Sequence, residues 1–249
     1  MDPFPTPDPA ALPAWRSHGA AEFIRPFVGR SFVVRVDESA GASSTFAADV
    51  VFMRSVGIRP VLVHDAAART AAQRLIGHIN RIGGDAVGLD GASAGMLTLA
   101  LGEDGAAELR GVNTALLNLL IEGGYIPVLA SEGAGVSGTR MPVDADEAAR
   151  ALAAAIGAIR LLFGSQPGGV PSDGSGIIPE LTSSEALSLA RSGALSIDLA
   201  HRLTAAALGV RAGVQAAQIL DLSSAHAAVV ELLTAQHLGT QVVSSILLS

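Results

Sequence analysis

Short apolar runs alternate with longer segments of helical spacing along most of this chain. Each run is bounded by Gly, Pro or polar residues, which is typical of a buried strand. The predicted strands cover residues 31–36, 60–63, 86–89, 125–129, 158–163, 216–220 and 241–247. Because strands that alternate with helices form mostly parallel sheets, we expect an α/β fold.

The segments between these runs carry start and stop signals of helices. Glycine follows most of them, and Thr182-Ser-Ser-Glu185 has the residue types of a capping box. The predicted helices cover residues 46–56, 69–82, 113–121, 144–157, 182–193, 198–211 and 224–233. Either Asp144 or Asp146 fits the start of the fourth helix. Gly102-Glu-Asp-Gly105 predicts a hairpin turn between two further apolar runs.

The chain divides into an N-terminal arm and one domain. Residues 1–30 contain a proline-rich start and a broken helical pattern over 12–27. We expect residues 31–249 to form a single domain, because strand and helix patterns continue without a linker.

Composition excludes several classes of partner and chemistry. The net charge is −7 and the pI about 5.3, which argues against nucleic acid or an anionic membrane as a partner. The chain has no cysteine, so disulfides, zinc–thiolate sites and thiol catalysis are excluded. With no signal pattern and no apolar stretch of about 18 residues, we expect a cytoplasmic protein.

All 16 cationic side chains are arginine, and lysine is absent. Phosphoryl-transfer sites usually place a compact, mobile ammonium on the transferring phosphate, and a planar guanidinium does not simply replace it. A coding bias toward arginine, alanine and glycine accounts for this composition. Such a bias removes lysine only where lysine is not required, so the absence argues against a conventional phosphotransferase.

Five sequence segments, which follow one another in the same order as in a known protein family, carry a resemblance over nearly the whole chain. They include Ile121-Glu-Gly-Gly-Tyr-Ile-Pro-Val128 and Val143-Asp-Ala-Asp-Glu-Ala-Ala149, together with residues 46–64, 79–89 and 232–240. The chain thereby resembles the N-acetylglutamate kinase branch of the amino-acid kinase family. The resemblance implies a three-layer αβα sandwich, with the acylamino acid bound by residues 31–140 and ATP by residues 141–249.

The phosphate loops depart from the family pattern. In the family the first strand ends in Lys-x-Gly-Gly and the second in His-Gly-Gly-Gly. Here these stretches read Arg35-Val-Asp37-Glu38 and His64-Asp65-Ala66-Ala67. Arginine replaces the lysine, and carboxylates that repel a triphosphate replace glycines. By resemblance, Arg35 is a degenerate catalytic position, and Asp37, His64 and Asp65 are vestigial ligand contacts.

The other catalytic positions are only partly retained. The second lysine of the family aligns with Arg202 or its neighbour His201, and the aspartate that positions both lysines aligns with Asp146. Arg35 and Arg202 are either surface arginines or partners of Asp146 in a relic of the site. Asp146 is equally explained as a helix N-cap.

Further vestigial contacts are implied on the nucleotide side. A substrate-binding asparagine of the family aligns with Pro142, and an acidic residue of the adenine loop aligns with Gln166. We include Asp144, Gly168 and Gly169 as vestigial ligand contacts, although the two glycines also fit an ordinary turn.

A deletion and two missing motifs complete the sequence evidence. Only 15 residues separate His64 from Asn80, which leaves no room for the family hairpin whose arginine grips the acylamino acid. His64 on an apolar strand also fits a buried core histidine. The histidines have no HxH or HExxH spacing and no GxSxG motif occurs, so neither a metal site nor a serine hydrolase is predicted.

We therefore expect a catalytically inactive kinase-like protein with a binding or regulatory role and no cofactor. The alternative is an active acylamino-acid kinase that uses arginines, ATP and Mg²⁺. Residues 20–29 and 232–240 resemble the arginine-inhibited, hexameric branch of the family, where they form an effector site. The expected partners are a second copy, as a dimer or a ring of dimers, an active paralogue, or an effector such as arginine.

Overall fold

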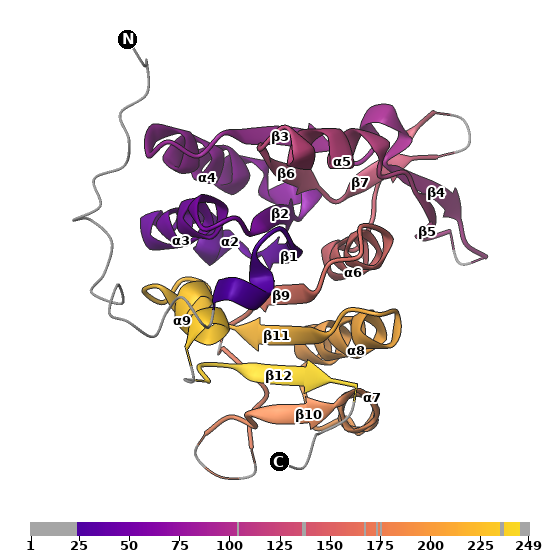
Figure 1. Cartoon of the computed structure of the whole chain (residues 1–249). Helices are drawn as coiled ribbons and strands as arrows, with labels where there is room; N and C mark the ends of the chain where they lie inside the picture. Colours follow the sequence, from indigo (N-terminus) through magenta and orange to yellow (C-terminus); the bar gives the residue numbers. More distant parts are fainter. Residues whose placement is uncertain are drawn as a thin grey trace.

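The computed structural model describes residues 24–103, 105–135, 138–166, 168–172, 174, 176–234 and 237–244. Eight strands form one sheet in the order β10-β12-β11-β9-β1-β2-β6-β3 (Figure 1). Their bounds are β1 Ser31–Val36, β2 Arg59–His64, β3 Ala86–Asp90, β6 Ile126–Ala130, β9 Arg160–Gly164, β10 Glu180–Thr182, β11 Ala216–Leu220 and β12 Thr240–Val243. All neighbouring pairs are parallel except β11 with β12. The predicted mostly parallel sheet is confirmed.

Helices cover both faces of this sheet and make it the middle of three layers. Their bounds are α2 Glu38–Ala42, α3 Ser44–Ser55, α4 Arg69–Arg81, α5 Ala115–Glu122, α6 Ala145–Ala155, α7 Ser183–Arg191, α8 Ile197–Arg211 and α9 Ala227–Leu233. The helices α3, α4 and α9 share one core with the sheet, and α5 to α8 share the other. In Figure 1 the two groups lie on opposite sides of the strands.

Strand alternation divides the two cores. Val33 of β1 belongs to the core under α5 to α8, whereas Phe32 and Val34 belong to the core under α3, α4 and α9. All three side chains are fully buried. Because successive side chains of a strand point to opposite faces, an apolar run of this kind suits a sheet covered on both sides.

A second, smaller sheet lies at one end of the molecule (Figure 1). Its strands, in the order β5-β4-β7-β8, are β4 Leu97–Leu101, β5 Ala107–Val112, β7 Glu132–Ala134 and β8 Arg140–Pro142. β4 and β5 form the predicted hairpin. The chain reaches this region from β3, and β2 leads instead through the short helix η3, Ala66–Ala68, directly into α4. No residues are left there for a hairpin between β2 and α4.

Most predicted elements are confirmed within one to three residues. The capping box at Thr182 and Glu185 is present at the start of α7. Three short strands (β7, β8 and β10) and the five-residue helix α2 were not predicted, because each is too short to show a period. The predicted helix 12–27 lies mostly outside the described residues, which contain only the 3-10 turn Arg25–Phe27 of it. The end of the last predicted strand, 245–247, also lies outside them.

Candidate functional site at the carboxyl ends of the strands

Six parallel strands end at the same edge of the main sheet, which is where α/β sheets bind their ligands. They are β3, β6, β2, β1, β9 and β11. Asp37 directly follows β1, Asp65 follows β2 and Ser165 follows β9. The topology therefore brings the two predicted phosphate loops next to each other.

Arg35, Asp146 and Arg202 lie together beneath this edge. Arg35 Nε is 2.8 Å from Asp146 Oδ1, and Arg202 Nε is 3.4 Å from Asp146 Oδ2. The three side chains are 14%, 8% and 13% exposed, so both guanidiniums share one buried carboxylate. Burial raises the pKa of Asp146, and the two guanidiniums act in the opposite direction.

The positions around this cluster resolve two alternatives from the sequence. The N-cap of α6 is Asp144, whose carboxylate accepts a hydrogen bond from Glu147 N–H at 2.8 Å. Asp146 lies two residues further on, in the first turn of α6, where it is a buried ion-pair partner and not the cap. Arg202 meets Asp146, whereas its exposed neighbour His201 lines a shallow groove with Asp144 on α6 and α8. Arg202 is thus the residue that shares the cluster.

The loop after β1 is closed by its own carboxylate. Asp37 caps α2, and its Oδ1 accepts hydrogen bonds from Ala40 N–H at 2.9 Å and from Ser39 Oγ–H at 3.0 Å. A Cβ added to Gly164 at the end of β9 would lie 3.2 Å from Asp37 Cγ. The carboxylate therefore lies between the ends of β1 and β9 and occupies a backbone donor that an anionic ligand would otherwise find free.

The loop after β2 is closed in the same way. Asp65 Oδ1 accepts from Ala67 N–H at 2.8 Å, and the carbonyl of Asp65 accepts from Ala68 N–H at 2.9 Å. The buried hydroxyl of Ser131 accepts from Ala66 N–H at 3.2 Å. Three successive amides that follow β2 are thus bonded within the protein.

His64 points into a very small cavity between the two loops. The cavity is about 10 Å³ and is lined by residues of β1, α2, β2 and α4, including Asp37 and Gly41. This is about the smallest volume that holds one water molecule. His64 is 7% exposed, its Nδ1 lies 2.8 Å from the Asp65 carbonyl oxygen, and burial lowers its pKa. A satisfied core histidine, one of the two alternatives, fits these observations.

The helix α2 closes this space from above by packing directly on α4. A Cβ added to Gly41 would lie 3.1 Å from the Cβ of Ala71. Glycine therefore lets the two helix backbones approach closely.

Two of the predicted nucleotide-side residues, Gln166 and Gly168, lie beside the loop that follows β11. Gly168 has φ of +90°, and a Cβ there would lie 3.2 Å from Asp221 Cβ. Gln166 Nε2 donates to Ser223 Oγ at 3.5 Å. A Cβ on the buried Gly169 would meet Ile177 and Thr240. Gly168 thus has the positive φ of a tight turn, and at both glycines the surrounding atoms leave little room for a side chain.

Four charged residues that sequence reasoning did not single out form an ion-pair network on the other side of the edge. Buried Glu132 receives Arg69 Nη2 at 2.6 Å and Arg140 Nη1 at 3.2 Å, and the same Arg140 atom lies 2.7 Å from Asp90 Oδ2. The bond to Glu132 raises the pKa of Arg69. Burial opposes ionisation of Asp90, but the bonds from Ser93 and Arg140 outweigh it and lower its pKa.

A short sequence signal marks the strand ends. Strands β1 and β11 are followed by an aspartate and β3 ends in one, and in each case a serine comes two or three residues later. Asp90 accepts from both N–H and Oγ–H of Ser93, and Asp221 does so from Ser223. Bonds of this type are local turns of aspartate onto the following backbone. The pattern was visible in the sequence and predicts closed loops.

The described residues contain no group of three or more His, Asp or Glu side chains that could hold a metal ion. Within the same part of the chain, no helix is long and apolar enough to cross a membrane.

Comparison with known proteins gives the class. A model of the amino acid kinase family matches residues 17–221. The chain belongs to this family.

Curated relatives that it matches include acetylglutamate kinases. The enzyme of Thermosynechococcus vestitus is 30% identical in an alignment that covers 91% of this chain and 92% of the relative. That of Nautilia profundicola is 28% identical over 264 residues, covering 90% and 94%. The chain is thus acetylglutamate kinase-like over most of its length.

Two solved structures share the fold. N-acetylglutamate synthase from Neisseria gonorrhoeae, complexed with coenzyme A and L-arginine, superposes with a TM-score of 0.79 at 21% identity, covering 91% of this chain and 64% of that one. Carbamate kinase from Giardia lamblia bound to AMP-PNP gives 0.66 at 12% identity, covering 87% and 99%. These likenesses support the amino-acid kinase fold.

Proposed function

We propose that this chain is a regulatory binding protein with an acetylglutamate kinase-like fold and that it does not transfer phosphate. One observation carries the proposal: the loops after β1 and β2 are folded onto their own carboxylates, Asp37 and Asp65. A phosphate that approached would find amides already bonded and would face two anions. Preorganised donors supply much of the rate in such reactions, and losing one commonly costs about 10²–10³ in rate.

The buried arginines support the same proposal. Arg35 and Arg202 both contact Asp146, and their side chains are largely hidden from solvent. Both guanidiniums are therefore largely closed to a triphosphate that approaches from solvent.

An assay of ATP consumption tests the proposal. Acetylglutamate, acetylaminoadipate and related acids are offered with Mg-ATP, and no turnover above background is expected. Turnover at about 1 s⁻¹ or faster, which is typical of kinases, contradicts it. The variant D37G/D65G serves as a probe of the cause, because reopening both loops should increase the affinity for Mg-ATP over that of the wild type.

The second candidate is an active acylamino-acid kinase, and the same cluster favours it. Arginine binds phosphate through paired hydrogen bonds, and Asp146 lies between Arg35 and Arg202. The acetylglutamate kinase relatives also favour this candidate. It requires ATP and Mg²⁺ as cofactors. Calorimetry separates the two candidates, because the active kinase must bind Mg-ATP and the regulatory protein need not.

We propose arginine or a similar cationic amino acid as the effector, bound between α9 and β12. The side chain of Glu231 on α9 is 1% exposed, and its Oε2 accepts from Leu238 N–H at 2.6 Å and Gly239 N–H at 3.3 Å. Its Oε1 has no hydrogen-bond partner among the described residues, and His237 Nδ1 is 3.8 Å away. A buried carboxylate oxygen of this kind needs a donor. The Neisseria synthase structure, which contains L-arginine, is consistent with this ligand class.

Thermal unfolding tests the effector. Arginine should raise the Tm, and citrulline, which has the same shape without the charge, should not. The variant Glu231→Gln should lose the response, and the exposed Glu122→Gln should keep it. Equal shifts with arginine and citrulline contradict the proposal.

Self-association belongs to the same proposal. We expect at least a dimer through helices of the N-terminal half, with a ring of dimers or an active paralogue as the larger assembly. Light scattering of the purified chain, alone and with arginine, measures this. A monomer at all concentrations contradicts it.

A further inference from the structure

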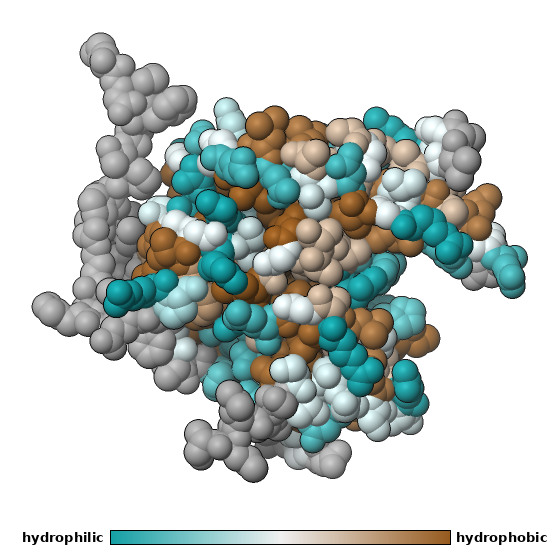
Figure 2. Space-filling model, turned by 45° about the vertical axis from the view of Figure 1, so that its right-hand side comes forward, coloured by the Kyte–Doolittle hydropathy of each residue, from teal (hydrophilic) through white to brown (hydrophobic). Residues whose placement is uncertain are grey.

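An open groove of about 420 Å³ runs along α7 and the adjoining end of α8. Its lining residues are Ser184, Leu187, Ser188, Arg191, Ser192 and Arg211. Three hydroxyls and two guanidiniums line it, with one apolar side chain and no carboxylate. In Figure 2 the lowest part of the described surface is mainly teal and white, the colours of polar and intermediate residues.

Neither arginine of this groove has an acidic partner among the described residues. Six other arginines form ion pairs with Asp or Glu; these are Arg35, Arg69, Arg110, Arg140, Arg150 and Arg202. Arg211 Nη2 instead donates to Ser184 Oγ at 3.2 Å, and Arg191 has no ion-pair partner in the described part of the chain. The helix dipole favours an arginine in the last turn of each helix, but it does not account for hydroxyls gathered beside both.

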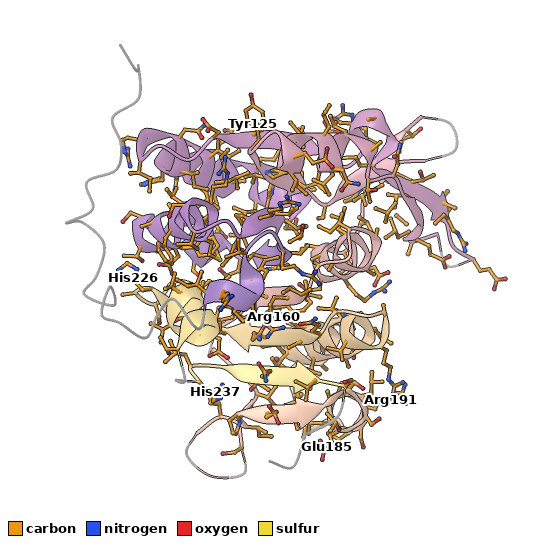
Figure 3. All side chains as sticks on the ribbon, in the orientation of Figure 1. Tyr125, Arg160, Glu185, Arg191, His226 and His237 are labelled. Carbon is orange, nitrogen blue, oxygen red and sulfur yellow. The ribbon has the colours of Figure 1, made fainter. Side chains whose placement is uncertain are left out.

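The nearest acid on α7 faces elsewhere. Glu185 Oε2 accepts from Thr182 N–H at 2.8 Å and from Thr182 Oγ1–H at 2.7 Å, which completes the capping box. Figure 3 shows Glu185 and Arg191 leaving α7 in different directions. In a chain with a net charge of −7, the groove therefore keeps a local positive charge.

We propose that this groove binds a small molecule through its phosphate group. Guanidiniums match phosphate oxygens with paired hydrogen bonds, and serine hydroxyls donate single ones. The volume lies within the range of about 300–1,000 Å³ that is usual for small-molecule sites. A mostly polar lining suits a hydrated anion better than an apolar ligand. None of Arg35, Asp37 or Asp65 lines the groove, so the site is separate from the strand-end site.

Calorimetry with pyrophosphate as the probe tests this site in the full-length protein. Arg191→Gln and Arg211→Gln should each weaken binding about tenfold, because each removes charged hydrogen bonds. The matched control is Arg74→Gln on α4, an exposed arginine that also loses one charge. It should change the affinity less than twofold. Ser188→Asp, which adds an anion to the groove, should abolish binding.

Three outcomes overturn the proposal. Equal weakening by Arg74→Gln shows an effect of net charge alone. Undiminished binding in the Arg191→Gln/Arg211→Gln double variant places the phosphate elsewhere, and tighter binding of citrate than of pyrophosphate shows a carboxylate site. All four substitutions are at exposed side chains, and a Tm within about 2 °C of the wild type would show that they leave the fold intact.

Discussion

Asp146 Oδ1 lies 2.8 Å from Arg35 Nε, and this contact between two predicted catalytic positions joins α6 to β1. Arg202 of α8 reaches the other oxygen of the same carboxylate at 3.4 Å. Burial raises the pKa of Asp146 in spite of both cations. The ionised carboxylate of Asp146 is thus stabilised by the two guanidiniums and hardly at all by solvent.

Removal of Arg35 should show how much the ion pairs stabilise the buried carboxylate of Asp146. We expect Arg35→Met to lower the free energy of unfolding by about 3 kcal/mol at pH 7, because it leaves a buried charge with less compensation. A folded pKa above the unfolded one gives stability at low pH that is lost as the pH rises through the folded pKa. Arg35 lowers the pKa of Asp146, so Arg35→Met should raise this pKa further and let the buried carboxyl become neutral at a higher pH. The loss of stability caused by Arg35→Met should therefore be smaller at pH 5, as urea unfolding at both pH values would show.

A neutral version of the cluster provides the contrast. Arg35→Met/Asp146→Leu/Arg202→Met removes all three charges and should recover most of the lost stability. Arg150→Met, which breaks the more exposed pair with Glu147 on α6, should cost less than about 1 kcal/mol. If the triple variant is less stable than Arg35→Met, the cluster contributes net stability and the interpretation is wrong.

Two helical glycines should respond oppositely to the same substitution. Gly41→Ala should destabilise the fold by about 1 kcal/mol, because the new Cβ would lie 3.1 Å from Ala71 Cβ on a rigid helix. Gly77→Ala in α4 meets open space and should stabilise it by about 0.5–1 kcal/mol. Thermal unfolding of both variants measures the difference. A gain in both would show that α2 and α4 can move apart.

Much of the fold could be predicted because its signals are local. The apolar run at Val33 and Val34 and the capping box at Thr182 act within a few residues of the chain. The short strands β7 and β8 pair with each other, and β7 pairs with β4. A three-residue stretch by itself carries no period. Their existence depends on the tertiary structure.

The sequence indicated where the candidate site lies better than it indicated how the loops of the site are closed. The replacement of glycines by Asp37 and Asp65 was visible, and repulsion of phosphate was the expected effect. The structure adds that both carboxylates cap the following backbone. Glu132 was missed, because Arg69 is distant in sequence and Arg140 reaches Glu132 only through the pairing of the short strands β7 and β8.

A buried hydroxyl ties the loop after β9 to the sheet. Thr240 Oγ1 accepts from Val170 N–H at 2.8 Å and donates to the Ile178 carbonyl at 2.7 Å. Thr240→Val keeps the shape but leaves both backbone groups unsatisfied, so we expect a loss of about 2–3 kcal/mol in urea unfolding. Thr240→Ser keeps the hydroxyl and should lose clearly less. Equal losses would mean that the methyl group, and not the hydrogen bonds, holds the loop.

A second buried acid joins α3 to α9. Asp49 is 2% exposed, and its Oδ1 lies 2.7 Å from His226 Nδ1, just before α9. The backbone amides of Ala228 and Val229 lie close enough to this carboxylate to favour its ionised form. Burial raises the pKa of Asp49 to about 6, although His226 and the two amides act in the opposite direction.

This shift predicts a specific pH dependence. Because the folded pKa lies above the unfolded one, the stability that Asp49 contributes is fully present below about pH 4 and is lost as the pH rises through about 6. Asp49→Asn is isosteric and does not titrate. The stability of the variant relative to the wild type should therefore improve by about 2–3 kcal/mol between pH 4 and pH 7. Urea unfolding at four pH values in this window measures it, with the exposed Asp85→Asn as a control for the lost charge. A difference between Asp49→Asn and the wild type that stays constant with pH would show that Asp49 titrates alike in both states, and burial would then not govern this contact between α3 and α9.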